Sequence, residues 1–147
     1  GDPVFDKLDA ALAGAVMSIG AVKAVEIGDG IAVSQAKGSE NNDPFHMCGG
    51  RVEKETNHAG GILGGISDGS RILLRAHIKP TPSIFSEQQT VTRDGEDISI
   101  RIKGRHDPVI VPRAVVVVES MTALVLADAL LSSMTARLDR IRDFYGV

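Results

Sequence analysis

The sequence predicts an α+β fold in which a mostly antiparallel sheet packs on helices, and three patterns support this prediction. Apolar side chains follow the spacing of a helical face near both ends of the chain. Between these helices, apolar and polar side chains alternate as in half-buried strands, and Asp94-Gly95 separates two such segments as in a tight hairpin. Helix, strands, hairpin and long helix in this order are typical of the α+β class, and 147 residues suffice for one domain.

The N-terminal segment predicts one helix followed by two strands. Asp2 is suited to the N-cap and Pro3 to the first helical position, where an N–H has no intrahelical partner to lose. We expect this helix to end at Gly20, because glycine readily terminates helices. Residues 21–27, which are rich in Val and Ile, predict a strand, and residues 31–36 predict a second short strand after a glycine turn.

The middle of the chain predicts a long loop followed by more β structure. Residues 37–56 lack an apolar period and are expected to form a mobile loop, because long structureless loops are usually lids, binding loops or disordered segments. Residues 57–69 are rich in glycine, and residues 71–79 alternate like a strand. Residues 88–92 and 97–103 are expected to pair across the hairpin, the second of them as a half-buried strand.

The C-terminal segment predicts a long helix that begins near Pro112 and keeps helical spacing almost to Tyr145. The apolar run 109–131 is long enough to raise the question of a membrane span. Charged side chains interrupt it, and each costs about 2.5–3.5 kcal/mol near a bilayer centre. The prediction is therefore a buried core helix in a soluble, cytoplasmic protein that has no membrane partner.

The composition excludes several kinds of partner. A formal net charge of −3 gives no general attraction for nucleic acid, and scarce aromatic side chains offer few platforms for stacking bases, so no nucleic-acid partner is expected. Cys48 is the only cysteine, which rules out an internal disulfide and favours a reducing compartment. His46 lies two residues from Cys48, but no further cysteine supports a zinc site, and no metal is expected.

Three segments combine unusual backbone chemistry with reactive side chains, and each has a functional and a purely structural interpretation. Residues 57–65 carry paired glycines, which let a ligand approach the backbone closely or simply form tight turns. Residues 79–83 join a cation and two hydroxyls to two prolines, a set that can grip a phosphate or form a rigid strand exit. Arg105 and Asp107 can bind an anion and accept a proton, or lie in a solvated surface turn.

Taken together, four blocks of this sequence resemble the chorismate synthase family, and the similarity covers essentially the whole chain. Their order and spacing match the family, which makes the set more specific than any one block. The blocks are Val25-Glu26-Ile27-Gly28-Asp29-Gly30, Asn57-His58-Ala59-Gly60-Gly61-Ile62-Leu63-Gly64-Gly65-Ile66, Lys79-Pro80-Thr81-Pro82-Ser83-Ile84, and Arg105-His106-Asp107-Pro108 followed by Pro112-Arg113-Ala114 and Glu119-Ser120-Met121.

The resemblance implies a carbon–oxygen lyase of aromatic amino acid biosynthesis. Its reaction would be the reduced-FMN-dependent 1,4-anti elimination of phosphate from 5-enolpyruvylshikimate-3-phosphate, which yields chorismate. By the same resemblance, Asp107 would assist removal of the C6 proton, with the flavin as relay, and Arg105 would reach flavin and substrate anion. The other residues implied to contact FMN are Gly20, Ala21, Gly64, Lys79, Pro80, Thr81, Pro82 and Ser83. A homotetramer is implied for the complete enzyme, with the source of reducing equivalents, NADPH or another donor, left open.

The family chain is considerably longer, and its two catalytic histidines and several phosphate-binding arginines lie in an N-terminal half that this chain lacks. The histidines present here, which are His46, His58, His77 and His106, do not match them. Residues 1–147 are therefore interpreted as the C-terminal portion, inactive alone, whose loop 37–56 orders only when flavin and substrate bind. The alternative is a non-catalytic phosphate- or nucleotide-binding module that assembles through its long helix. A hydrolase using His106 and Asp107 ranks last, because it lacks a nucleophile.

Overall fold

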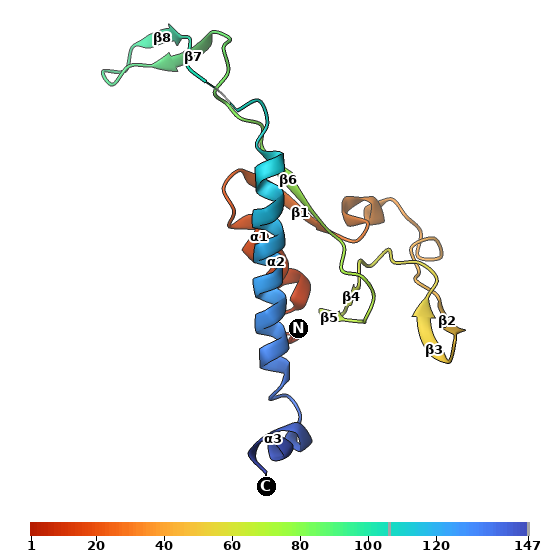
Figure 1. Ribbon diagram of the computed structural model, residues 1–147. Helices are drawn as coiled ribbons and strands as arrows, with labels where there is room; N and C mark the ends of the chain where they lie inside the picture. Colours follow the sequence, from red (N-terminus) through yellow and green to blue (C-terminus); the bar gives the residue numbers. More distant parts are fainter. Residues whose placement is uncertain (106, 147) are drawn as a thin grey trace.

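The computed structural model describes residues 1–105 and 107–146 and confirms an α+β chain with antiparallel strand pairs. The helices are α1 (Leu8–Met17), α2 (Val111–Ser133) and α3 (Leu138–Tyr145), with a 3₁₀ turn, η1 (Gly30–Ser34). The strands are β1 (Val22–Ile27), β2 (Phe45–Cys48), β3 (Arg51–Lys54), β4 (Ile62–Leu63), β5 (Ile66–Ser67), β6 (Leu74–Ile78), β7 (Gln88–Val91) and β8 (Asp97–Ile100). They pair as β1–β6, β2–β3, β4–β5 and β7–β8. Figure 1 shows α2 as a long spine, with β7–β8 projecting beyond one end and β2–β3 to the side.

The core lies where α1 packs against α2 and β1. Leu8, Leu12 and Val16 are spaced four residues apart and share one face of α1, where each is at most 2% exposed. Leu8 and Leu12 form a buried cluster with Ile62 of β4, and apolar side chains of β1, β6 and α2 pack against it. Burial of one such side chain contributes about 1.5–3 kcal/mol, so this small cluster is what holds the helices and the glycine-rich segment together.

The β1–β6 pair carries the alternation that the sequence predicts. Leu74, Ala76 and Ile78 of β6 are half-buried on one face, whereas Arg75 and His77 are exposed on the other. The pairing is antiparallel, and a bulge between Val22 and Ala24 shifts its register at the start of β1. This ladder fixes the beginning of β1 beside the end of β6, which is where the candidate site lies.

Three predictions for the N-terminal region are wrong. The helix begins at Leu8, not at Pro3, because Val4 has a φ of 81° and the Leu8 amide donates to the Gly65 carbonyl instead of to a local cap. It also ends at Met17, before Gly20. Residues 30–34 form η1 where a strand was expected, since Glu26 Oε1 accepts the Ile31 amide and tightens the turn after β1.

Residues 37–56 are not the structureless loop that the sequence predicts. They contain the β2–β3 hairpin, whose turn is Gly49-Gly50 with φ values of 56° and 80°. Two consecutive positive φ angles match the type I′ turn, which suits the twist of a tight hairpin. The alternation was hard to recognise because both faces of the hairpin are exposed, so neither face is uniformly apolar. The predicted Asp94-Gly95 hairpin is confirmed as β7–β8, although the structure leaves β8 exposed.

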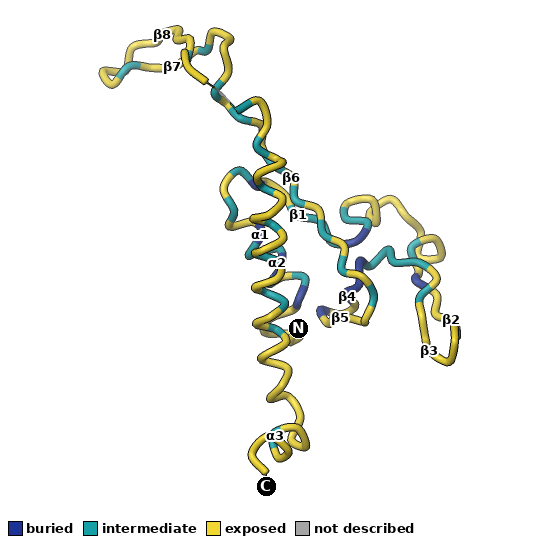
Figure 2. Tube along the Cα trace, in the orientation of Figure 1, coloured by how far each residue is buried: buried dark blue, intermediate teal, exposed yellow. Residues whose placement is uncertain are grey.

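Helix α2 begins as predicted, but the expectation that it is buried is wrong for this chain. Leu124, Leu130 and Leu131 are 64–66% exposed, because α1 covers only part of its length (Figure 2). The continuous helix expected to Tyr145 is interrupted after Ser133, where serine and threonine hydroxyls bond to nearby carbonyls and α3 starts again at Leu138. Within the described residues, α2 is the one helix long and apolar enough to cross a membrane, judged by length and composition alone.

Candidate functional site

A pocket of about 370 Å³ lies where β1 begins and β6 ends. The Lys79 amide donates to the Ala21 carbonyl at 2.7 Å, which extends the β1–β6 ladder by one bond and brings the Lys79 segment beside the start of β1. The lining residues are Ala21, Lys23, Lys79, Pro80, Thr81, Pro82 and Ile110. The pocket therefore collects five of the residues that the resemblance implies for FMN, and two lysines place positive charge at its edge.

Ala21 has a left-handed backbone at the edge of this pocket. Its φ of 71° is a backbone conformation that residues with a Cβ rarely adopt, because it costs them roughly 1–2 kcal/mol. Gly20 precedes it, and Val22, 3% exposed, follows it into the core. The strain is tolerated because the buried Val22 and the bond from Lys79 fix the chain on both sides. Strain of this kind is often found where a backbone is shaped for a ligand.

Thr81 supplies a polar group that the described residues do not satisfy. Its Oγ1 is buried and has no hydrogen-bond partner within residues 1–105 and 107–146. A buried polar group left without a partner costs about 1–3 kcal/mol. A hydroxyl can both donate and accept, so a polar ligand atom would satisfy it once the segment shifts enough to expose the oxygen. This hydroxyl, between two rigid prolines, fits a polar cofactor such as FMN.

Arg105 and Asp107 lie outside the pocket lining. Asp107 Oδ2 accepts a hydrogen bond from Arg113 Nη1 at 2.8 Å, and the two side chains are 42% and 77% exposed. Arg105 is exposed, and His106 lies outside the described residues. Three residues beyond Asp107, however, Ile110 lines the pocket, so this segment leads directly to it. The sequence did not identify Arg113 as the partner of Asp107. The signal available was their position, since Asp107 lies just before α2 and Arg113 lies in its first turn.

Gly64 and Ser83 are also absent from the pocket lining, and Gly64 lies elsewhere. It forms the β4–β5 turn with Gly65, whose carbonyl accepts the Leu8 amide at the N-terminus of α1. Ala21 lies past the other end of that helix, which places the two segments roughly 15 Å apart at 1.5 Å per helical residue. A Cβ on Gly65 would approach Lys7 Cγ at 2.6 Å, whereas a Cβ on Gly64 would meet nothing within 4 Å. Close packing against Lys7 therefore explains why residue 65 is a glycine, whereas packing does not explain the glycine at position 64.

The structure reveals a buried ionic network that the sequence did not indicate. Lys54 Nζ contacts the carboxylates of Asp43 and Asp68, and its side chain is 4% exposed. Asp43 also accepts the amides of His58 and Ala59. Burial raises the pKa of Asp43, but the hydrogen bonds from these amides and from a neighbouring hydroxyl, together with the Lys54 charge, hold it well below its usual range. The network fastens the β2–β3 hairpin to the glycine-rich segment.

Two histidines pair with carboxylates near η1. His58 Nδ1 lies 2.6 Å from Asp29 Oδ2, and His77 Nε2 lies 3.0 Å from Glu26 Oε2. The amide of Ile31 and the His77 ring lower the pKa of Glu26. His77 is exposed on β6, as the sequence predicts, and neither histidine lines the pocket. These pairs shape the turn after β1 and offer no nucleophile.

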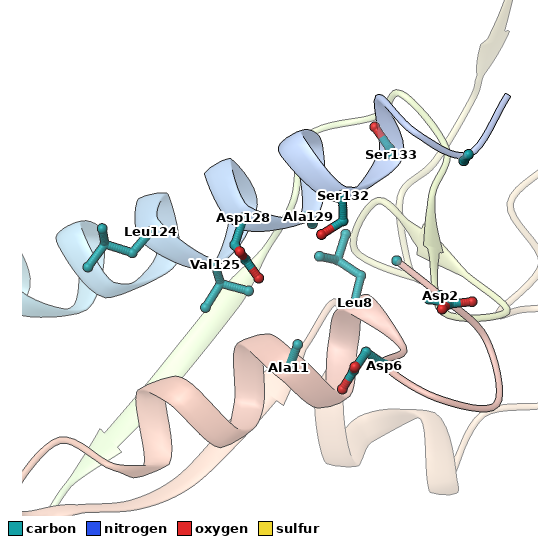
Figure 3. Close-up of a pocket in the computed structure, with 12 residues that line it drawn as sticks. Asp2, Asp6, Leu8, Ala11, Leu124, Val125, Asp128, Ala129, Ser132 and Ser133 are labelled. Atoms are coloured by element: carbon teal, nitrogen blue, oxygen red, sulfur yellow. The ribbon is translucent and has the colours of Figure 1, made fainter. Parts of the chain in front are cut away.

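A larger pocket of about 710 Å³ lies between α1 and α2. Figure 3 shows apolar side chains such as Leu8 and Val125 on its walls, with the carboxylates of Asp2, Asp6 and Asp128 among the polar groups beside them. Three carboxylates repel a phosphate, whereas the Lys79 pocket has two lysines. The pocket between α1 and α2 is the larger of the two, but the Lys79 pocket has the charge that attracts an anionic ligand. The Lys79 pocket is therefore the candidate site for such a ligand.

The fold and the Lys79 pocket define an α+β chain whose pocket has two lysines in its lining, which suits an anionic small molecule. Comparisons identify the family. The chorismate synthase family model matches residues 1–131. The chain is 66% identical over 145 residues to a chorismate synthase of Agathobacter rectalis and 62% identical over 132 residues to one of Archaeoglobus fulgidus, covering 99% and 89% of this chain. The chain belongs to the chorismate synthase family, whose members are carbon–oxygen lyases of aromatic amino acid biosynthesis.

Structural comparison agrees with this assignment and shows how much of the family's chain is represented. A solved structure titled as the crystal structure of chorismate synthase matches with a TM-score of 0.68 and 32% identity, over 95% of this chain and 35% of that one. The chain likewise spans 40% of the length of the Agathobacter rectalis protein and 37% of the Archaeoglobus fulgidus protein. The match thus extends over most of this chain and over less than half of each relative.

Proposed function

We propose that residues 1–147 are the C-terminal portion of a chorismate synthase and supply part of its FMN site. The complete enzyme would eliminate phosphate from 5-enolpyruvylshikimate-3-phosphate by a 1,4-anti route to give chorismate, in the cytoplasm and as a homotetramer. One observation carries the proposal for this chain: the pocket of Ala21 and Lys79–Pro82 contains a buried Thr81 hydroxyl without a partner among the described residues.

The pocket residues have distinct roles in this proposal. The Lys79 ammonium attracts the anionic part of the cofactor, and the Thr81 hydroxyl hydrogen-bonds a polar atom of it. Pro80 and Pro82 keep the segment rigid, which reduces the entropy lost when a ligand binds. Gly20 and Ala21 bring backbone close to the ligand, while Ser83 and Gly64 are proposed as further contacts. Reduced FMN, when bound, supplies the electron density that the departure of phosphate requires.

Asp107 and Arg105 are the residues of this chain that are proposed to take part in the reaction. The Asp107 carboxylate accepts the proton released from substrate C6, and Arg105 holds an anionic group of substrate or cofactor. The hydrogen bond from Arg113 orients the carboxylate. Ile110, three residues further along, borders the pocket, so the segment that carries Asp107 leads to the pocket.

A second candidate function follows from the position of these two residues. Arg105 and Asp107 lie outside the pocket, and α2 exposes a long apolar surface. A non-catalytic phosphate- or nucleotide-binding module that assembles through α2 would have both features. It requires cofactor binding that does not depend on Arg105 or Asp107, and no elimination chemistry.

Titration with reduced FMN under anaerobic conditions, on the complete protein, tests the site. Lys79→Ala is expected to weaken binding at least about tenfold, since a hydrogen bond to a charged group contributes about 1.5–3 kcal/mol. Thr81→Val should weaken it by a smaller factor. Lys37→Ala and Thr90→Val are the matched controls, because both residues are exposed and distant in sequence from the pocket. Equal affinities in the Lys79 and Lys37 variants would refute the proposed site.

A further inference from the structure

The β2–β3 hairpin brings three metal-ligating side chains together on one face. His46 and Cys48 are two apart on β2, so they point to the same side of the strand. Glu53 of β3 lies directly opposite His46 in the ladder. The ligand atoms of the three residues all lie within 4.8 Å of one another. All three side chains are exposed, so an ion can reach them from solvent.

The register that creates this cluster is fixed by the hairpin turn. Gly49 and Gly50, both with positive φ, connect the strands by the shortest common hairpin loop. A shift of one residue would move Glu53 to the opposite face of the sheet and separate it from His46. At the base of the hairpin, Lys54 is held by the carboxylates of Asp43 and Asp68, which anchors the arm to the rest of the chain.

We propose that His46, Cys48 and Glu53 form a zinc site with solvent as the fourth ligand. An imidazole, a thiolate and a carboxylate suit Zn²⁺, whereas Mg²⁺ and Ca²⁺ select oxygen ligands. Zinc bonds of about 2.0–2.3 Å in a tetrahedron place ligand atoms about 3.3–3.6 Å apart. The cluster needs to contract by at most about 1.2–1.5 Å, which rotation of exposed side chains provides.

The charges of the cluster match a divalent ion. Binding releases the thiol proton of Cys48 to solvent, so the thiolate and the Glu53 carboxylate together neutralise Zn²⁺ while His46 binds as a neutral ring. Arg51 lies opposite Cys48 in the ladder and is the cation on the same face. Its positive charge opposes the metal slightly, which makes this an exchangeable site of moderate affinity.

Bound zinc would cross-link β2 to β3 and stiffen the hairpin. A two-stranded hairpin is marginally stable by itself, and the outer part of this one has few contacts because both faces are exposed. A metal bridge between His46 and Glu53 adds the missing constraint. This site is separate from the proposed FMN pocket, whose lining includes none of its residues.

Titration of the reduced protein with Zn²⁺, and with Co²⁺ as a spectroscopic probe, tests this proposal. One Zn²⁺ per chain is expected, and Co²⁺ should give a thiolate charge-transfer band together with the intense visible bands of a four-coordinate ion. Cys48→Ser should abolish the charge-transfer band. His46→Ala and Glu53→Gln should each weaken zinc binding at least about tenfold. Glu55→Gln removes the same charge two residues away and should leave the affinity unchanged.

Three results would overturn the proposal. The first is a zinc affinity that is the same in Cys48→Ser as in the parent chain. The second is cobalt binding without a thiolate band. The third is one Zn²⁺ per two chains with dimer formation, because the ligands would then come from two copies. Since all three substituted residues are exposed, their variants should fold, and circular dichroism spectra that match the parent verify this.

Discussion

Lys54 and Asp43 form a buried ion pair, with Nζ 3.4 Å from Oδ2 and side chains only 4% and 5% exposed. Asp68 contacts the same ammonium group, so one cation serves two carboxylates. Removing one partner of a buried pair leaves uncompensated charge and typically costs about 3–5 kcal/mol. The pair fastens the β2–β3 hairpin to the glycine-rich segment of residues 57–69, so loss of the pair should destabilise both.

Lys54→Met is expected to lower the free energy of unfolding by about 3–5 kcal/mol, because two buried carboxylates lose their shared cation. Lys37→Met is the matched control, since the Lys37 side chain is 82% exposed and should contribute less than about 0.5 kcal/mol. Urea unfolding followed by circular dichroism measures both. Similar losses in the two variants would contradict the structural role of the network.

Acid should weaken the fold through Asp43. Its pKa is lower in the folded chain than in the unfolded chain, where it lies near about 3.9. The resulting stability is complete above the unfolded value and is lost as pH falls toward the folded value, so unfolding should become easier below about pH 5. Asp68 acts in the same direction. Asp43→Asn should flatten the acid slope of the unfolding free energy, and an unchanged slope would exclude this explanation.

Two glycines of the same segment are expected to respond differently to alanine. At Gly60, a Cβ would lie 2.4 Å from the Gly28 amide nitrogen, so Gly60→Ala combines a clash with strain at a φ of 67°. Gly64→Ala meets open space and should cost only about 1–2 kcal/mol from its left-handed backbone. Thermal unfolding should rank Gly60→Ala as the more harmful. If Gly64→Ala instead reduces FMN affinity more than stability, its proposed cofactor role gains direct support.

The sequence predicted those features that depend on local patterns. The alternation of Leu74, Ala76 and Ile78 identified β6, and Asp94-Gly95 identified the β7–β8 hairpin. It failed where distant contacts decide the outcome. The Leu8 amide bonds to Gly65, which moves the start of α1, and the β2–β3 hairpin has no uniformly apolar face to reveal a period of two.

The residues of the candidate site fall into the same two groups, those that local patterns predict and those that depend on distant contacts. Ala21 and the Lys79–Pro82 segment come together because a strand pairing joins them, and that pairing follows from two recognisable strands. Asp107 and Gly64 lie outside this ladder, so their position relative to Lys79 depends on tertiary contacts that a linear pattern does not encode. The Asp43–Lys54 pair was missed for the same reason, since polar residues in an aperiodic segment give no sign of burial.

The exposed side of α2 should make this chain associate or dissolve poorly. Leu124 and Leu130 are 66% and 65% exposed on a 23-residue helix, and large exposed apolar surfaces usually mark an interface. We expect the double variant Leu124→Lys/Leu130→Lys to be more monomeric at equal concentration. Size-exclusion chromatography with light scattering measures this, and Arg137→Lys serves as a surface control. A parent chain that is monomeric at high concentration would contradict the prediction.

The chain alone should not form chorismate at enzymatic rates, because it spans about 40% of the length of its relatives. Co-expression of this chain with the remaining portion of a full-length relative is expected to give phosphate release from 5-enolpyruvylshikimate-3-phosphate in the presence of reduced FMN. Chorismate absorbance and phosphate assays follow the product. Turnover by the purified chain alone would falsify the interpretation of this chain as an incomplete catalyst.

In the complete enzyme, Asp107→Asn should slow turnover by roughly 10²–10⁴-fold while leaving FMN affinity nearly unchanged, because an amide cannot accept the substrate proton. The substitution also removes the ion pair with Arg113. Arg113→Leu separates the two effects, since it breaks the same pair but keeps the carboxylate. If Asp107 accepts the proton, Arg113→Leu should reduce kcat far less than Asp107→Asn. Equal losses would assign the effect to the ion pair, and no loss in either variant would exclude Asp107 as the proton acceptor.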